Sequence, residues 1–154
     1  MFFAFLVPVY YQFWYYTTTA YFLRFIKFSL RLDFKEKYLS DFNLYTPRNY
    51  EIARFLTTSS YKKDKVFVWG PDSPTIYALS RRLPPIKYVA DYHVFDYSDK
   101  GEVVKMLSLD KPRFIIITPE AKPFSEIVNL LRQNYFLVNK IEEAEIWSLV
   151  GSPK

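Results

Sequence analysis

The chain has 154 residues, half of them hydrophobic and 21% aromatic, which excludes an intrinsically disordered protein and is enough for one folded domain with an additional segment. Its formal net charge is +5, and residues 1–40, with five basic against two acidic side chains, hold +3 of it beside an uncharged run, so a nucleic-acid partner is not expected. The absence of cysteine excludes disulfides and thiolate metal sites, and three glycines are too few for a glycine-rich phosphate loop.

Residues 1–23 contain no charged side chain, and eleven of them are aromatic. A helix of this length spans roughly 34 Å, more than the bilayer core of about 30 Å, and we predict a transmembrane helix here, the last span of a larger protein. Because Tyr and Trp favour the membrane interface, residues 10–16 mark one edge of that span. A signal peptide is disfavoured, since no basic residue precedes the run and no small-residue cleavage site follows it. A buried helix of a soluble domain stays open, because Gln12 and residues 17–19 weaken the apolar signal.

Residues 24–45 are predicted to form a basic amphipathic connector next to the membrane. Where this connector begins, the basic Arg24 and Lys27 are interleaved with apolar side chains, namely Phe22, Phe25, Ile26 and Phe28. This pattern is typical of a helix that lies in the headgroup layer, where rings face the acyl chains and cations meet lipid phosphates. We therefore expect membrane lipid as a partner of the connector.

The first half of residues 46–154 predicts helix, strand, helix and strand. Pro47 suits the first turn of a helix over residues 48–58. The apolar run Lys65–Trp69 predicts a buried strand. Ser73 is expected to cap the next helix, which has Pro74 at its first position and ends before Pro84 and Pro85. The second strand is predicted at Lys87–Ala90.

The second half predicts helices over Asp99–Leu109 and Pro123–Gln133, separated by a strand at Arg113–Thr118. That strand is a continuous β-branched run, which indicates burial on both faces. A hairpin of Tyr135–Ile141 and Glu145–Val150 closes the chain. Residues 46–154 therefore predict a small α/β domain of three layers, with parallel central strands and a C-terminal antiparallel hairpin, preceded by one transmembrane or interfacial helix.

Three stretches within residues 42–92 carry a resemblance to a known family: EIARFL at Glu51–Leu56, VFVWG at Val66–Gly70 and PTIYALSRRLP at Pro74–Pro84. In this order they resemble the carboxy-terminal region of bacterial membrane glycosyltransferases of the GT-C class, which are relatives of the protein mannosyltransferases and the lipid A aminoarabinose transferase. In many members the last transmembrane helix leads to a small α/β domain outside the cytoplasm. Arg81 departs from the pattern, because small residues such as glycine are common there.

The resemblance implies a function that this chain does not catalyse by itself. The family moves a sugar from a polyprenyl-phosphate carrier to a lipid, glycan or protein acceptor. Its catalytic carboxylates lie in a loop between early membrane helices, which no segment here matches. The implied partners are membrane lipid, the remaining transmembrane part of the glycosyltransferase, and the polyprenyl-phosphate sugar or its acceptor. No cofactor is expected in this chain, which is either a fragment of a longer protein or a solitary accessory domain.

The resemblance implies that the α/β domain lies outside the cytoplasm, and this orientation conflicts with the positive-inside rule. The positive-inside rule would place the basic segment in the cytoplasm, whereas the family places the domain that follows it outside. We follow the family, because the rule compares both flanks of a span and only one is present. Two other functions stay open: a membrane-anchored α/β interaction module unrelated to glycosyl transfer, and a soluble α/β enzyme with a buried aromatic amino terminus.

Four side chains are candidate binding residues. Arg81 and Arg82 suit the oxygens of a lipid phosphate or pyrophosphate, although cations are also favoured at the carboxyl end of a helix. Asp91 and His93, with Asp96, form a D-x-H-x-x-D pattern after the second predicted strand, where α/β sheets bind ligands. A surface loop is the alternative there, and no metal site is assigned.

The remaining residues of the motif are interpreted as structural, namely Trp69, Gly70, Pro74, Tyr77 and Pro84. Trp69 and Tyr77 are expected in the core, with a sugar-stacking platform as the alternative.

Overall fold

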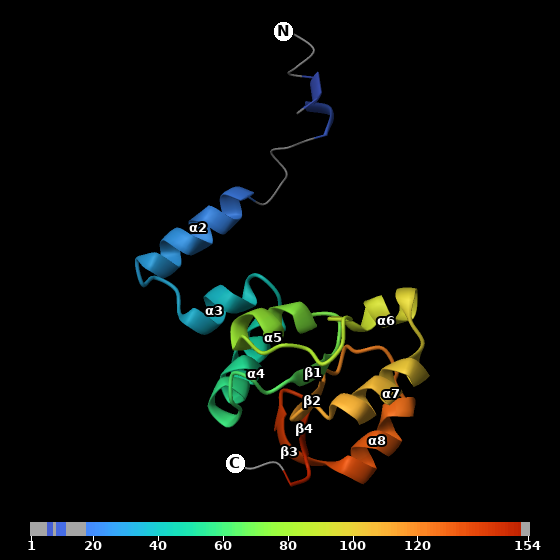
Figure 1. The fold of residues 1–154 in the computed structure, drawn as a ribbon. Helices are drawn as coiled ribbons and strands as arrows, with labels where there is room; N and C mark the ends of the chain where they lie inside the picture. The colour runs from blue at the N-terminus through green and yellow to red at the C-terminus, as the bar shows by residue number, and fades with distance from the viewer. Residues whose placement is uncertain (1–5, 8, 12–17, 152–154) are drawn as a thin grey trace. The chain divides into compact units, whose positions relative to one another are not determined.

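The structure is a computed structural model that describes residues 6, 7, 9–11 and 18–151 (Figure 1). The chain divides into two compact units, Met1–Pro47 and Arg48–Lys154. The predicted transmembrane helix over residues 1–23 falls mainly on residues 1–5, 8 and 12–17, which lie outside the described residues. Among the described residues, no helix has the length and apolar character needed to cross a bilayer.

The first unit contains helices α2 (Thr18–Ser29) and α3 (Lys35–Ser40), which pack through aromatic rings. The Phe28 and Tyr38 rings stack with their centroids 4.4 Å apart. Arg24 Nη1 donates a 2.9 Å hydrogen bond to the main-chain oxygen of Asp41. No residue of α2 is buried, so its other face, with Phe22 and Ile26, is exposed.

The second unit is a mixed α/β fold around a four-stranded sheet of order β1-β2-β4-β3. Strand β1 (Val66–Trp69) is parallel to β2 (Phe114–Ile117), with Val66 opposite Phe114. Strands β3 (Tyr135–Ile141) and β4 (Ala144–Leu149) form an antiparallel hairpin, and β4 also pairs antiparallel with β2. The structure therefore confirms the predicted strands at Lys65–Trp69 and Arg113–Thr118 and the predicted C-terminal hairpin.

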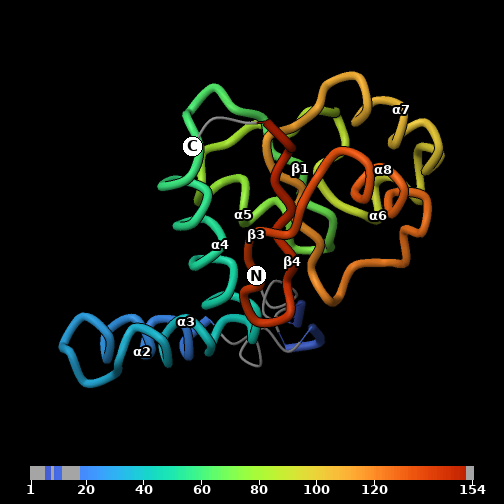
Figure 2. Tube along the Cα trace, turned by 90° about the horizontal axis from the view of Figure 1, so that it is seen from below, coloured from blue at the N-terminus to red at the C-terminus, as the bar shows by residue number. Residues whose placement is uncertain are grey.

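Helices cover both faces of this sheet (Figures 1 and 2). Alternate residues of a strand point to opposite faces, so Val68 joins one core and Phe67 the other. The first core includes α4 (Thr46–Ser59) and α5 (Ser73–Ser80). The second includes α6 (Asp91–Tyr97), α7 (Lys100–Asp110) and α8 (Glu126–Asn134). This explains why β1 is buried along its whole length.

The predicted strand at Lys87–Ala90 is wrong, because these residues form an irregular segment. Ile86, Tyr88 and Ala90 are buried and the residues between them are more exposed, which reproduces the period of a strand without its ladder. An isolated bridge joins Leu83, upstream of this segment, to Lys65, which precedes β1. Strand β1 is consequently an edge strand, and the predicted parallel centre of the sheet is reduced to the β1–β2 pair.

Two local predictions also need correction. The D-x-H-x-x-D pattern does not form a loop, because Asp91–Tyr97 is helix α6. Ser73 is the first helical residue of α5 and not its cap. Its hydroxyl donates to the main-chain oxygens of Gly70 and Val68, at 2.6 and 3.1 Å, and so closes the turn after β1.

Candidate functional site: a basic pocket at the amino ends of two parallel strands

A pocket lies where β1 and β2 begin. Because the two strands are parallel, the turns that precede them meet at the same edge of the sheet. The main-chain N–H of Arg113 donates to the oxygen of Lys65 at 2.9 Å and joins these turns. The pocket has a volume of about 480 Å³ and is lined by Tyr61, Lys63, Asp64, Lys65, Asp110, Lys111, Arg113 and Leu149.

The lining of this pocket is positively charged. Four basic and two acidic side chains line it, which gives it a net charge of +2. Lys65 Nζ bonds both carboxylate oxygens of Asp110, at 2.6 and 2.9 Å. Arg113 Nη1 lies 3.4 Å from the carboxylate of Asp64. Each carboxylate thus has a basic partner inside the pocket, and the excess positive charge corresponds to the exposed Lys63 and Lys111.

Arg113 is the most enclosed cation of the pocket, with 12% of its side chain exposed. Its guanidinium carbon lies 6.0 Å from the centroid of the Tyr61 ring and 5.5 Å from that of Phe114. Its Nε is buried and has no hydrogen-bond partner among the described residues.

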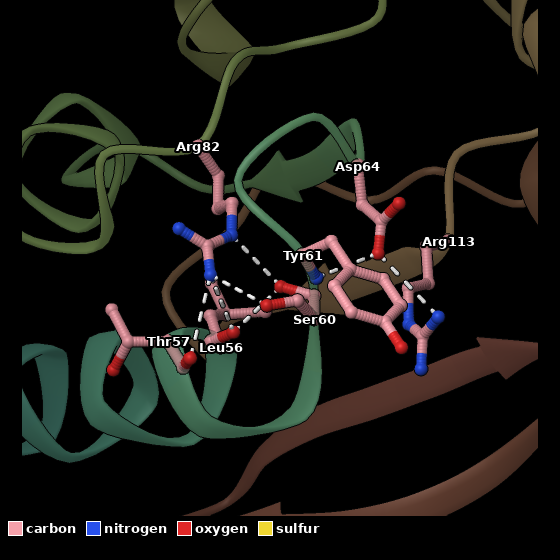
Figure 3. Close-up of polar contacts among 7 residues, drawn as sticks. All are labelled: Leu56, Thr57, Ser60, Tyr61, Asp64, Arg82 and Arg113. Carbon is pink, nitrogen blue, oxygen red and sulfur yellow. Dashed lines mark hydrogen bonds and ion pairs between the residues drawn. The ribbon is translucent and has the colours of Figure 1, made fainter. Parts of the chain in front are cut away.

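The loop of residues 60–64 forms one wall of the pocket and is held from two sides (Figure 3). On one side, Arg82 donates from Nε to Ser60 Oγ at 2.8 Å and from Nη2 to Ser60 O at 2.7 Å. Longer bonds run from Nη2 to the main-chain oxygens of Leu56 and Thr57. These are carbonyls of the last turn of α4, which have no partner within the helix. On the other side, Asp64 accepts from the N–H of Tyr61 at 2.8 Å.

The structure gives the two predicted arginines different environments. Arg82 is buried, and its guanidinium donates to main-chain and hydroxyl oxygens of the protein. Arg81 is exposed, has φ 55°, and ends α5 through a 2.9 Å bond from its N–H to the oxygen of Tyr77. Arg82 therefore contributes to the fold, and phosphate binding by Arg81 and Arg82 stays a prediction.

Asp91 and His93 both lie in α6, but only Asp91 is buried. Its carboxylate accepts from the N–H of Tyr92 at 2.7 Å and from the N–H of Lys122 at 2.9 Å. These bonds tie α6 to the segment that follows β2. The His93 ring is half-buried and lies 4.5 Å from that of Tyr92. In the described part of the chain, no three His, Cys, Asp or Glu side chains are grouped to hold a metal.

Of the residues interpreted as structural, Trp69, Gly70 and Tyr77 are buried around β1, whereas Pro74 is exposed in the first turn of α5 and Pro84 is half-buried. Trp69 is buried and donates from Nε1 to the oxygen of Lys122 at 2.7 Å. Tyr77 Oη accepts a 2.8 Å bond from the N–H of Val68, and burial raises the pKa of Tyr77. A Cβ at Gly70 would lie 2.2 Å from Oγ1 of Thr118, which explains the glycine there.

The sequence contains two short basic triplets that line the pocket, and neither matches the residue pattern of a known type of site. Each parallel strand is preceded by a lysine, any residue and a second cation: Lys63-Asp64-Lys65 before β1 and Lys111-Pro112-Arg113 before β2. Taken singly, each triplet is an ordinary solvated turn. Only the parallel pairing of β1 with β2 brings the two together.

No family model, curated protein or solved structure matches the chain.

Proposed function

We propose that the chain provides the last membrane span and the extracytoplasmic α/β domain of a GT-C-class membrane glycosyltransferase that uses a polyprenyl-phosphate-linked sugar. The domain does not catalyse; it supports the membrane part or holds the carrier or acceptor. One observation carries the proposal: the three stretches that resemble the family pack as a single unit, α4–β1–α5.

The contacts within this unit involve the residues that define the resemblance. Ile52 of the first stretch is fully buried in the same core as Val68 of the second and Ile76 of the third. Tyr77 joins the third stretch to β1 through the N–H of Val68. Arg82 joins it to the end of α4 through Ser60. Residues that specify one packed unit are expected to recur together, so the resemblance is a signature of this fold unit.

The first unit supports a membrane location. Helix α2 has aromatic and aliphatic side chains that are mostly exposed, with Phe22, Leu23 and Ile26 each about half exposed or more. Lys27 lies in its last turn. Exposed rings combined with cations fit the headgroup layer, where both kinds of side chain gain favourable contacts.

The test is made in the cell that produces the protein. Residues 48–151 are removed in frame, and polyprenyl-phosphate-linked sugars are measured in the membrane by mass spectrometry. We expect the lipid-linked sugar to accumulate, because its transfer slows when the domain is missing. The full chain should reverse the accumulation, and so should Arg54→Ala, a change at an exposed side chain outside the packed unit's core. Unchanged lipid-linked sugars on removal would contradict the proposal.

A second candidate is a membrane-anchored interaction module unrelated to glycosyl transfer. It is favoured by β3, an edge strand whose Phe136, Leu137 and Val138 are all exposed. An apolar edge of this kind can pair with a strand of another protein. The same measurement separates the two functions, because an interaction module predicts no change in the lipid-linked sugars.

A further inference from the structure

We infer that the pocket at the amino ends of β1 and β2 binds a terminal phosphoryl group, as a phosphate monoester or a pyrophosphate. The inference goes beyond the proposed function and does not rest on it, because it is argued from the pocket alone. It concerns side chains of the two strand-preceding triplets, none of which belongs to the sequence-predicted binding residues.

Charge is the first argument. The lining has a net charge of +2 once each carboxylate is matched with its basic partner. A phosphate monoester carries about −1.5 to −2 at pH 7. A terminal phosphoryl group therefore matches the excess positive charge of the pocket, whereas a single carboxylate would leave about half of that charge unneutralised. Lys63 and Lys111 are the cations that supply this excess.

Preorganisation is the second argument. Lys65 is fixed on Asp110 and Arg113 on Asp64, while the wall of residues 60–64 is fixed by Arg82 (Figure 3). The walls of the pocket therefore need little ordering when an anion enters, which favours affinity, whereas the exposed Lys63 and Lys111 side chains become ordered on binding. Arg113 also contributes a planar guanidinium to the lining. Guanidinium groups suit phosphate because they present several donors in one plane.

Size and lining are the third argument. A cavity of about 480 Å³ is within the range of small-molecule sites, roughly 300–1,000 Å³, and leaves room for the group that carries the phosphate. Tyr61 is 60% exposed and lies beside the Arg113 guanidinium, so its ring offers a flat surface next to the cations. The ligand class is thus a phosphate ester whose attached group packs on an aromatic face.

The experiment uses the full chain and titrates it calorimetrically with inorganic pyrophosphate and with a sugar 1-phosphate. The test variant combines Lys63→Gln with Lys111→Asn, since Asn tolerates the positive φ of 42° at position 111. The matched control combines Lys105→Gln with Arg132→Gln, two exposed basic residues that do not line the pocket. We expect the test variant to lose about tenfold or more in affinity, given the strength of charge-assisted hydrogen bonds, and the control to stay within about twofold.

A second arm identifies the source of the phosphoryl group. Vesicles with phosphatidic acid present a phosphate monoester, and vesicles with phosphatidylglycerol at the same mole fraction present a diester. Tighter flotation with phosphatidic acid, lost in the test variant alone, identifies a lipid headgroup. Equal flotation with both lipids, together with calorimetric binding that the test variant loses, identifies a soluble phosphate ester. Absence of binding in both arms, or equal loss in the control variant, overturns the inference.

Discussion

Arg82 Nε donates a 2.8 Å hydrogen bond to Ser60 Oγ, and this contact joins the segment after α5 to the end of α4. The buried guanidinium of Arg82 donates to the main-chain oxygens of Leu56 and Thr57, in the last turn of α4, and of Ser60, which follows that helix. It also fixes one wall of the basic pocket. A single side chain thus links the sequence signature of the domain to its candidate binding site.

Truncation of Arg82 is expected to destabilise the domain. Arg82→Ala removes the donor to the main-chain oxygens of Ser60 and Ser80, whereas the oxygen of Leu56 keeps the N–H of Ser60, and should lower the free energy of unfolding by about 2–4 kcal/mol. Arg82→Lys keeps the charge but has fewer donors, so its free energy of unfolding should lie between those of the original protein and Arg82→Ala. Chemical unfolding followed by tryptophan fluorescence measures the change. Arg54→Ala is the control, because Arg54 is exposed and pairs only loosely with Glu51 at 4.0 Å. Equal stability of Arg82→Ala and the control would show that the contact is dispensable.

Arg81→Gly should stabilise the domain. Arg81 has φ 55° at the carboxyl end of α5, a left-handed conformation that glycine adopts without steric strain. We expect the free energy of unfolding to rise by about 0.5–1 kcal/mol, because the strain relieved exceeds the extra backbone entropy of glycine. Arg81→Ala removes the same charge but keeps the Cβ, so it should give no gain. The result would also explain why small residues are common here in the resembling family.

Relief of backbone strain in the turn of the β3–β4 hairpin should also stabilise the domain. Glu142 and Glu143 have φ of 43° and 66°, the combination that two-residue type I′ turns require and that Asn-Gly satisfies best. Glu142→Asn with Glu143→Gly should raise the free energy of unfolding by about 1 kcal/mol, even though the exposed Lys140–Glu143 pair is lost. Glu142→Gln with Glu143→Gln is the matched control, and its thermal unfolding midpoint should not rise.

At acid pH, protonation of Glu120 should remove the contribution of its ion pair with Arg48 to the free energy of unfolding. Burial raises the pKa of this carboxyl, but hydrogen bonds from Arg48 outweigh that effect and hold the pKa below its ordinary value of 4.5. A carboxyl whose pKa is lowered by folding stabilises the fold above its unfolded pKa, and the contribution disappears as the pH falls through the folded pKa. Glu120→Gln should therefore lower stability at pH 7 by about 1–2 kcal/mol and much less at acid pH. Glu51→Gln, at an exposed carboxyl, should leave the pH profile unchanged.

Elements with a distinctive residue pattern could be predicted from the sequence. The β-branched run of β2 is buried on both faces as predicted, and the helix predicted over Asp99–Leu109 is α7, for which Asp99 is the cap. The residues at 87–90 have the composition of a short strand, but a ladder depends on a neighbouring strand that the sequence does not reveal. The pocket was missed for a related reason, since Lys63 and Lys111 are 48 positions apart and meet only through strand pairing.

The central claim is that residues 48–151 form a domain outside the cytoplasm, attached to a membrane. The most direct test fuses alkaline phosphatase, which is active outside the cytoplasm, after Lys154 of the full chain, and fuses a cytoplasmic fluorescent reporter at the same position in a parallel strain. The account predicts high phosphatase activity in the membrane fraction and no fluorescence. Fluorescence without phosphatase activity would place the domain in the cytoplasm and contradict the account.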